Sequence, residues 1–291
     1  MKYFDYEASS GLKFTHMDDA GDFLNVESAK LPQTIDYIRA HGPIQLYLNW
    51  RRGFLQKNLS FLAGIEILVE GLIIVVDKMD LEGIENCVNL KYLQLSDDYD
   101  QPIAFDQFSC LTSCFLQWNK SYSLATFPYS LAELRISSYN SQFGFNKSSL
   151  HNLRNITKLT LTQAAIDNLS LIQYCGPLTR LDIAYGRTLT DISALTIHAD
   201  SLTHLDIDKC KKIIDFAPLR QLIKLQWLNL CDCKSIPSLA FVQYLPALDH
   251  CVFFGTTVED GDLSYLKGIS QVAFNNKPHY SLKMKDFEST T

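Results

Sequence analysis

Glycine and proline are scarce in this chain, at 13 and 9 of 291 residues, and long hydrophobic runs are missing. So little glycine and proline excludes a collagen-like or low-complexity chain. Aromatic residues are plentiful (17 Phe, 14 Tyr and 3 Trp) and supply more apolar surface than a disordered chain carries. The sequence therefore predicts a folded, globular protein.

No segment reaches the roughly 20 consecutive apolar residues that cross a bilayer. The most apolar stretch, residues 64–76, contains Glu66 and Glu70. The first 22 residues include Asp5 and Glu7 and lack the basic start and apolar run of a secretory signal. We therefore expect no contact with a membrane and a cytoplasmic location.

Positive charge is also in short supply. The chain has 26 Lys and Arg against 32 Asp and Glu, which gives a net charge of −6. A protein that follows a phosphate backbone needs a basic surface. We therefore expect no nucleic-acid partner.

The usual catalytic motifs are missing as well. The sequence has no Gly-x-Ser-x-Gly elbow, no His-Glu-x-x-His pair and no glycine-rich phosphate loop. We expect that the protein is not an enzyme and holds no cofactor. A catalytic site assembled from several distant segments remains an alternative.

The sequence does contain a repeated unit, apolar-x-x-apolar-x-apolar. Its six clear copies are Leu90–Leu95, Leu131–Ile136, Ile156–Leu161, Leu178–Ile183, Leu202–Ile207 and Leu225–Leu230. Weaker copies begin at Pro43, Leu62, Leu111, Leu248 and Ile269. The last two apolar residues of each unit alternate with a polar one, which predicts a short strand with one buried face. The short connections between these strands require the strands to run parallel.

These hexads, together with segments such as Leu189–Leu195, resemble the leucine-rich repeat family and in particular its internalin-like branch. The resemblance implies an α/β solenoid, a leucine-rich repeat horseshoe with a parallel concave β-sheet and an irregular or short-helical convex side. Repeats this small cannot bury their own apolar face, so they stack around one continuous core. We expect the last two apolar residues of each clear hexad to be buried. The alternative is another α/β protein whose buried strands happen to recur.

The extent of the repeat divides the chain into three parts. Residues 1–42 do not fit the pattern, and Leu31–Ile38 followed by Gly42 predicts a short helix and its end. We expect residues 1–42 to form an N-terminal cap, residues 43–276 about 11 repeats, and residues 277–291 a C-terminal cap or tail. An extra apolar run, Gly71–Val76, predicts either an additional strand or a local bulge.

The cysteines follow the repeat. Six of the eight recur at equivalent, mostly interior positions: Cys87, Cys114, Cys175, Cys210, Cys233 and Cys251. Free cysteine in such positions behaves as a small hydrophobic residue, so we expect buried thiols, no disulfide and no metal. We expect Cys231 on the concave face and Cys233 in the interior, where they cannot readily share a zinc ion.

The outward positions of the concave face carry aromatic and acidic residues that the scaffold does not need. Aromatic side chains in water are enriched at protein interfaces, and aspartates on adjacent strands repel each other unless a positive group covers them. The predicted partner-binding residues are Tyr47, Trp50, Phe115, Trp118, Asp182, Tyr185, Asp206, Asp208, Trp227, Asp232 and Phe254. The simpler alternative is that these residues only keep the strands soluble.

We therefore expect a non-catalytic module that binds another protein, with basic character, on its concave sheet. The resemblance to stand-alone bacterial leucine-rich repeat proteins suggests an immunity protein that occludes a toxin. The alternative is a secreted or surface internalin-like host-interaction protein whose export signal is missing from this chain.

Overall fold

The computed structural model describes residues 3–140 and 152–287, so residues 1–2 of the predicted cap and 288–291 of the predicted tail lie outside it. The described residues form two compact units. Unit 1 contains residues 3–134 and 152–153, and unit 2 contains residues 135–140 and 154–287.

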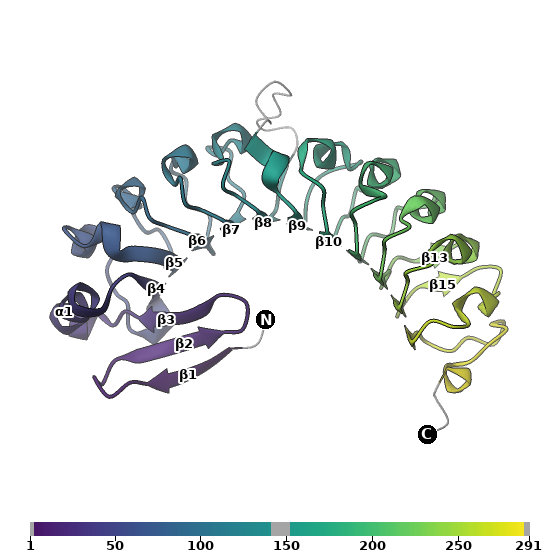
Figure 1. Cartoon of the computed structure of the whole chain (residues 1–291), viewed down its shortest axis with the longest axis horizontal. Helices are drawn as coiled ribbons and strands as arrows, with labels where there is room; N and C mark the ends of the chain where they lie inside the picture. Colours follow the sequence, from purple (N-terminus) through teal and green to yellow (C-terminus); the bar gives the residue numbers. More distant parts are fainter. Residues whose placement is uncertain (1–2, 141–151, 288–291) are drawn as a thin grey trace. The chain divides into compact units, whose positions relative to one another are not determined.

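The N-terminal part of unit 1 contains three strands in addition to the predicted helix. The helix α1 (Leu31–His41) ends at Gly42, as predicted. Strands β1 (Tyr3–Glu7), β2 (Lys13–Met17) and β3 (Gly21–Asn25) pair in antiparallel fashion. Strand β3 then pairs in parallel with β4 (Ile44–Asn49), so this region extends the sheet (Figure 1).

The repeats of unit 1 contribute parallel strands in chain order. These are β4, β5 (Val69–Val75), β6 (Tyr92–Leu95) and β7 (Ser113–Gln117). Short 3-10 helices lie between and after these strands: η2 (Trp50–Arg52), η3 (Ser60–Leu62) and η4 (Glu66–Leu68) between β4 and β5, then η5 (Ile84–Asn86), η6 (Phe105–Gln107) and η7 (Leu124–Thr126). The convex side is therefore short-helical, as predicted.

The apolar run Gly71–Val76 forms most of β5, which is the strand of a repeat. Leu72 and Ile74 occupy the core positions of β5, whereas Leu62, where a repeat was expected to begin, lies in the 3-10 turn η3. The expected repeat start is therefore wrong. Its cause is that β5 is covered on both faces, since Ile73 packs into a second hydrophobic cluster on the outward side. A strand buried on both faces appears as a continuous apolar run and loses the alternation.

Unit 2 is a stack of the same kind. Its parallel strands are β9 (Lys158–Thr162), β10 (Arg180–Ala184), β11 (His204–Asp208), β12 (Trp227–Asn229), β14 (His250–Val252) and β16 (Gln271–Ala273). The short strands β13 (Ser235–Ile236) and β15 (Thr257–Val258) pair separately. Strand β8 (Glu133–Ser137) contains residues of both units.

Short 3-10 helices also connect the strands of unit 2 and follow its last strand: η9 (Ser170–Tyr174), η10 (Ser193–His198), η11 (Ala217–Gln221), η12 (Ala240–Tyr244), η13 (Ser264–Leu266) and η14 (Met284–Asp286). The twelve hexad residues expected in the core are all at most 1% exposed: Leu93, Leu95, Leu134, Ile136, Leu159, Leu161, Leu181, Ile183, Leu205, Ile207, Leu228 and Leu230. Parallel strands with this interior are those of a leucine-rich repeat solenoid, which confirms the predicted fold class.

A buried histidine connects two repeats of unit 2. His198 is 4% exposed. Its Nδ1 accepts a hydrogen bond from the Leu178 amide (3.3 Å), so Nε2 carries the proton and donates to the Ile172 carbonyl (3.0 Å). Burial lowers the pKa of His198, although the bond to Ile172 partly opposes the shift. The neutral imidazole is therefore the form that the fold requires.

We expect Ile207→Ala to lower the free energy of unfolding by about 2–5 kcal/mol, because it leaves a cavity in a closely packed core. Ile207 is fully buried, whereas Ile214, seven residues later, is 78% exposed. The matched change Ile214→Ala should alter stability by less than about 0.5 kcal/mol. Urea denaturation of both variants measures the difference, and equal losses would contradict the assigned core.

We expect the fold to lose stability as the pH falls from 7.5 to 5. The unfolded chain protonates histidine near pH 6.5, whereas the folded His198 does so at lower pH. Between these values the unfolded state binds more protons, so acid favours unfolding. Urea denaturation at pH 7.5 and at pH 5 should show that the free energy of unfolding changes less with pH in His198→Gln than in the unaltered protein. An unchanged pH effect in that variant would contradict the role of His198.

Candidate protein-binding surface

The outward side chains of unit 2 form rows, because parallel strands pair residue with residue. One row contains Arg180, His204, Trp227 and His250, on β10, β11, β12 and β14. The next row contains Asp182, Asp206 and Asn229 on the first three of these strands. We call these outward residues, together with the residues that follow the strands, the unit 2 face.

Trp227 lies at the centre of the first row, between two histidines. Its ring stacks on His204 at 5.4 Å between centroids with an interplanar angle of 9°, and on His250 at 4.7 Å and 26°. His250 Nδ1 also lies 3.0 Å from Asp249 Oδ2. Trp227 is half-buried by these contacts, and they hold its flat ring in one orientation on the unit 2 face.

A third row of side chains lies just after the ends of the strands. Each residue of this row has a left-handed backbone conformation. Tyr185, Lys209 and Asp232 occupy equivalent positions after β10, β11 and β12, with φ values of 57°, 55° and 52°. Lys209 Nζ lies 2.9 Å from Asp208 Oδ2, 3.6 Å from Asp232 Oδ2 and 4.9 Å from the centre of the Tyr185 ring. The hydrogen bond to Asp208 is the main reason that the pKa of Lys209 is raised. One lysine thus connects three successive repeats.

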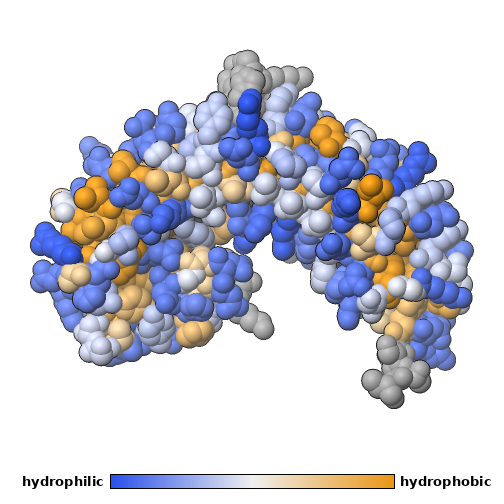
Figure 2. Space-filling view, viewed as in Figure 1, coloured by the Kyte–Doolittle hydropathy of each residue, from blue (hydrophilic) through white to orange (hydrophobic). Residues whose placement is uncertain are grey.

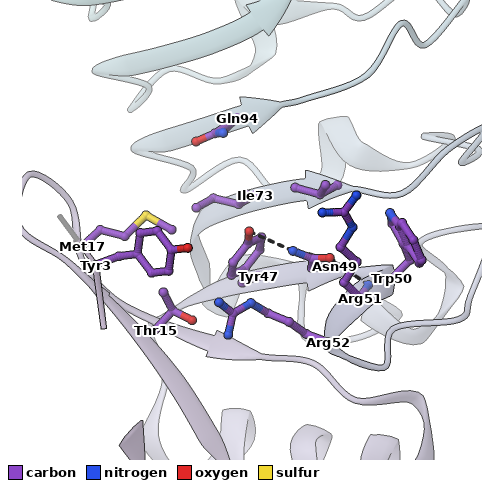
Figure 3. Close-up of a pocket in the computed structure, with 11 residues that line it drawn as sticks. Tyr3, Thr15, Met17, Tyr47, Asn49, Trp50, Arg51, Arg52, Ile73 and Gln94 are labelled. Carbon is purple, nitrogen blue, oxygen red and sulfur yellow. Dashed lines mark hydrogen bonds between the residues drawn. The ribbon is translucent and has the colours of Figure 1, made fainter. Parts of the chain in front are cut away.

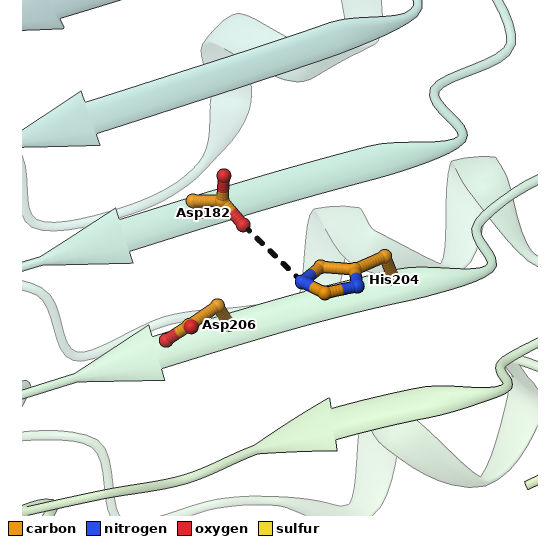
Figure 4. Close-up of side chains that lie close together, drawn as sticks. All are labelled: Asp182, His204 and Asp206. Carbon is orange, nitrogen blue, oxygen red and sulfur yellow. Dashed lines mark ion pairs between the residues drawn. The ribbon is translucent and has the colours of Figure 1, made fainter. Parts of the chain in front are cut away.

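Neighbouring side chains hold the row of aspartates, of which Figure 4 draws Asp182 and Asp206. Asp182 Oδ2 accepts hydrogen bonds from Arg180 Nε (2.8 Å) and Thr160 Oγ1 (3.1 Å). Asp206 Oδ1 accepts one from Asn229 Nδ2 (2.9 Å). Arg180, Lys209 and Asn229 therefore already offset part of the repulsion between these aspartates.

Burial shifts the pKa values of two side chains on the unit 2 face, Asp206 and His204. The pKa of Asp206 is raised, mainly because burial disfavours its charged form and secondly because Asp182 and Asp208 are negative. The pKa of His204 is lowered, mainly by burial and also by Arg180, while Asp182 partly opposes the shift. The imidazole of His204 is therefore neutral at pH 7.

Two of the aromatic residues predicted on the concave face of unit 1 are buried. Phe115 is 9% exposed and packs against Met17, Phe23, Ile73 and Tyr92. The cause is the hairpin formed by β2 and β3, which contributes Met17 and Phe23 to the outward side. The expectation that Phe115 is an exposed anchor is therefore wrong.

Trp118 is also buried, at 6% exposed. It follows β7 and makes an edge contact with Tyr122, at 6.3 Å between ring centroids. Strand alternation no longer sets its direction beyond the end of β7, so its predicted outward position is wrong.

Tyr47 and Trp50 lie on a cavity of about 740 Å³ in unit 1 (Figure 3). Arg51 lies 5.0 Å from the Trp50 ring centre, and Arg52 lies 5.2 Å from that of Tyr47. Arg52 also forms an ion pair with Asp5 at 2.7 Å. Both aromatic residues are therefore accessible, but their arginine neighbours make this surface basic.

The other predicted residues lie together on the unit 2 face. Asp182, Tyr185, Asp206, Trp227 and Asp232 belong to the three rows, Asp208 ends β11 and pairs with Lys209, and Phe254 follows β14 at 45% exposed. Sequence reasoning missed the roles of Arg180, His204 and Lys209. The available signal for Arg180 and His204 was their shared third position in successive hexads.

Exposed apolar residues also occur away from the strands. Leu55 is 72% exposed and Ile67 is 61% exposed, both between β4 and β5. Figure 2 shows hydrophobic residues gathered over this part of unit 1. They belong to connecting segments and lie outside the predicted site.

All eight cysteines are free thiols. Cys233 is fully buried and Cys231 is only half-buried. Both lie between β12 and β13, on either side of the left-handed Asp232 (φ 52°), so this turn and not strand alternation separates them. Burial raises the pKa of Cys233 and of Cys251 to about 12. These thiols therefore stay protonated and unreactive at pH 7. Among residues 3–140 and 152–287, no helix is both long enough and apolar enough to cross a bilayer.

Solved structures of leucine-rich repeat proteins share this fold. An internalin (InlF) from Listeria monocytogenes is 22% identical over 75% of this chain and 63% of its own, with a TM-score of 0.56. A leucine-rich repeat protein from Leptospira interrogans is 16% identical over 78% of this chain and 60% of its own, with a TM-score of 0.57. The functional domain of InlJ from Listeria monocytogenes, which includes a cysteine ladder, is 15% identical over 80% of this chain and 47% of its own, with a TM-score of 0.56.

In each case the match spans less than two thirds of the other chain. No family model matches this chain, and no curated protein matches it in sequence. The likeness shows that the chain has the internalin-like leucine-rich repeat fold that its hexads predicted.

We expect Phe115→Ala to lower the free energy of unfolding by about 3 kcal/mol, because Phe115 belongs to a packed cluster. Trp50→Ala should change stability by less than about 0.5 kcal/mol, since the Trp50 side chain is 53% exposed. Thermal and urea denaturation of both variants provide the comparison. A stable Phe115→Ala protein would restore Phe115 as a residue available for binding.

Proposed function

We propose that this protein binds another protein through the unit 2 face and carries out no chemistry of its own. The observation that supports this most strongly is the stack of Trp227 between His204 and His250. An aromatic ring held in one rotamer contributes contact area and loses little conformational entropy when a partner binds. The leucine-rich repeat core does not need this ring, because Leu228 fills the interior position of the same strand.

The surroundings of Trp227 fit the anatomy of a binding site. Tyr185 and Phe254 are 40% and 45% exposed and extend the apolar contact area along the strand ends. The ion pairs of Lys209 with Asp208 and Asp232 supply a polar rim. Interfaces typically combine a central aromatic anchor with such a rim.

The finer proposal is an immunity protein that occludes a toxin domain of basic character. Its support is the charge of the face, where Asp182, Asp206, Asp208 and Asp232 outnumber the cations Arg180 and Lys209. Excess negative charge accelerates association with a basic partner, and added salt weakens this effect.

A second candidate is a host-interaction protein at the cell surface, and the fold likeness to InlF favours it. The cysteine ladder named for InlJ is a further point of comparison, because Cys210 and Cys233 occupy equivalent positions in consecutive repeats here. Fractionation of the native cells separates the two candidates. Recovery in the cytoplasm supports the immunity function, and recovery at the surface or in the medium supports host interaction.

We expect Trp227→Ala to weaken binding of the partner by about 2 kcal/mol or more, roughly 30-fold in Kd, with little change in melting temperature. The partner is first captured from native cells with the unaltered protein, purified and identified. A titration with each variant then measures Kd.

The matched controls are Ile214→Ala and Lys212→Ala, which change exposed residues on the connection after β11. Both should bind as the unaltered protein does. If these controls abolish binding while Trp227→Ala preserves it, the partner binds the connecting segments and the proposed surface is wrong.

A further inference from the structure

Three potential metal ligands from adjacent strands converge on the unit 2 face. One ligand atom each from Asp182, His204 and Asp206 lies within 4.8 Å of the other two. Asp182 comes from β10, and the other two come from β11 (Figure 4). His204 Nε2 and Asp182 Oδ1 are 3.7 Å apart. Ligands of one tetrahedral zinc ion lie roughly 3.3–3.6 Å apart, which the separation of His204 Nε2 and Asp182 Oδ1 nearly matches.

Two of these atoms are buried without a hydrogen-bond partner among the described residues. They are Asp182 Oδ1 and His204 Nε2. They face each other, yet their separation is too long for a hydrogen bond. An unsatisfied buried polar atom destabilises the folded state, because it gives up its hydrogen bonds to water without replacement. A cation between them would satisfy both.

The other oxygen of each carboxylate is already held by the protein. Arg180 and Thr160 donate to Asp182 Oδ2, and Asn229 donates to Asp206 Oδ1. Each carboxylate is thus fixed and keeps one oxygen for an ion, as is usual where outer groups orient metal ligands. The Trp227 ring stacks on His204 and fixes the plane of the imidazole.

We propose that Asp182, His204 and Asp206 bind one divalent transition-metal ion of the zinc class. Imidazole with carboxylates suits zinc, cobalt or nickel, whereas calcium and magnesium prefer oxygen ligands alone. Three protein ligands leave a fourth position on the ion for water or for a side chain of a partner. The proposal does not depend on the proposed protein partner, because the isolated chain suffices to test it.

The test is calorimetric titration of the full, chelator-treated protein with zinc chloride, alongside Asp182→Asn, His204→Gln and Asp206→Asn. We expect one zinc ion per chain and a loss of at least tenfold in affinity in each variant. Circular dichroism and melting temperature establish that the variants fold. Cobalt(II) gives a second readout, since its visible absorption reports the ligand set.

The matched control is His250→Gln, because His250 stacks on the opposite side of Trp227 and pairs with Asp249. It should retain the zinc ion. The proposal is overturned if the unaltered protein shows no saturable zinc binding, if the three variants bind zinc as it does, or if magnesium and calcium bind equally well.

Discussion

The structure depends on the in-register pairing of parallel strands. Leu181 of β10 lies opposite Leu205 of β11, and Leu205 lies opposite Leu228 of β12. A single repeat cannot bury its apolar residues, so this alignment creates the core. The same register necessarily aligns the outward residues, so Asp182 lies beside Asp206 and His204 lies beside Trp227. The strand register therefore determines both which residues meet in the core and which residues lie side by side on the surface.

The alignment also brings like charges together, and other residues of the same chain offset part of their repulsion. Acidic side chains on neighbouring strands repel one another, and burial of Asp206 is a further cost. Arg180, Lys209 and Asn229 offset part of it through hydrogen bonds and ion pairs. A surface whose side chains are already held in place loses less entropy when it binds a partner.

The sequence predicted the fold well because its signal is local. Alternation within each hexad identified the twelve core residues, and Leu31–Ile38 followed by Gly42 identified α1. The failure at Phe115 is non-local. Nothing near Phe115 in the sequence indicates that the β2–β3 hairpin covers it.

The cluster of Asp182, His204 and Asp206 was missed for a similar reason. It appears only when two hexads are aligned by their strand register.

The most direct test of the unit 2 face is carbodiimide labelling of carboxylates, read by mass spectrometry with and without the purified partner. We predict that Asp208 and Asp232 become protected in the complex. Asp215 and Asp260, in the connecting segments after β11 and after β15, should be labelled equally in both states. Protection of Asp215 and Asp260 with unchanged labelling of Asp208 and Asp232 would contradict the account.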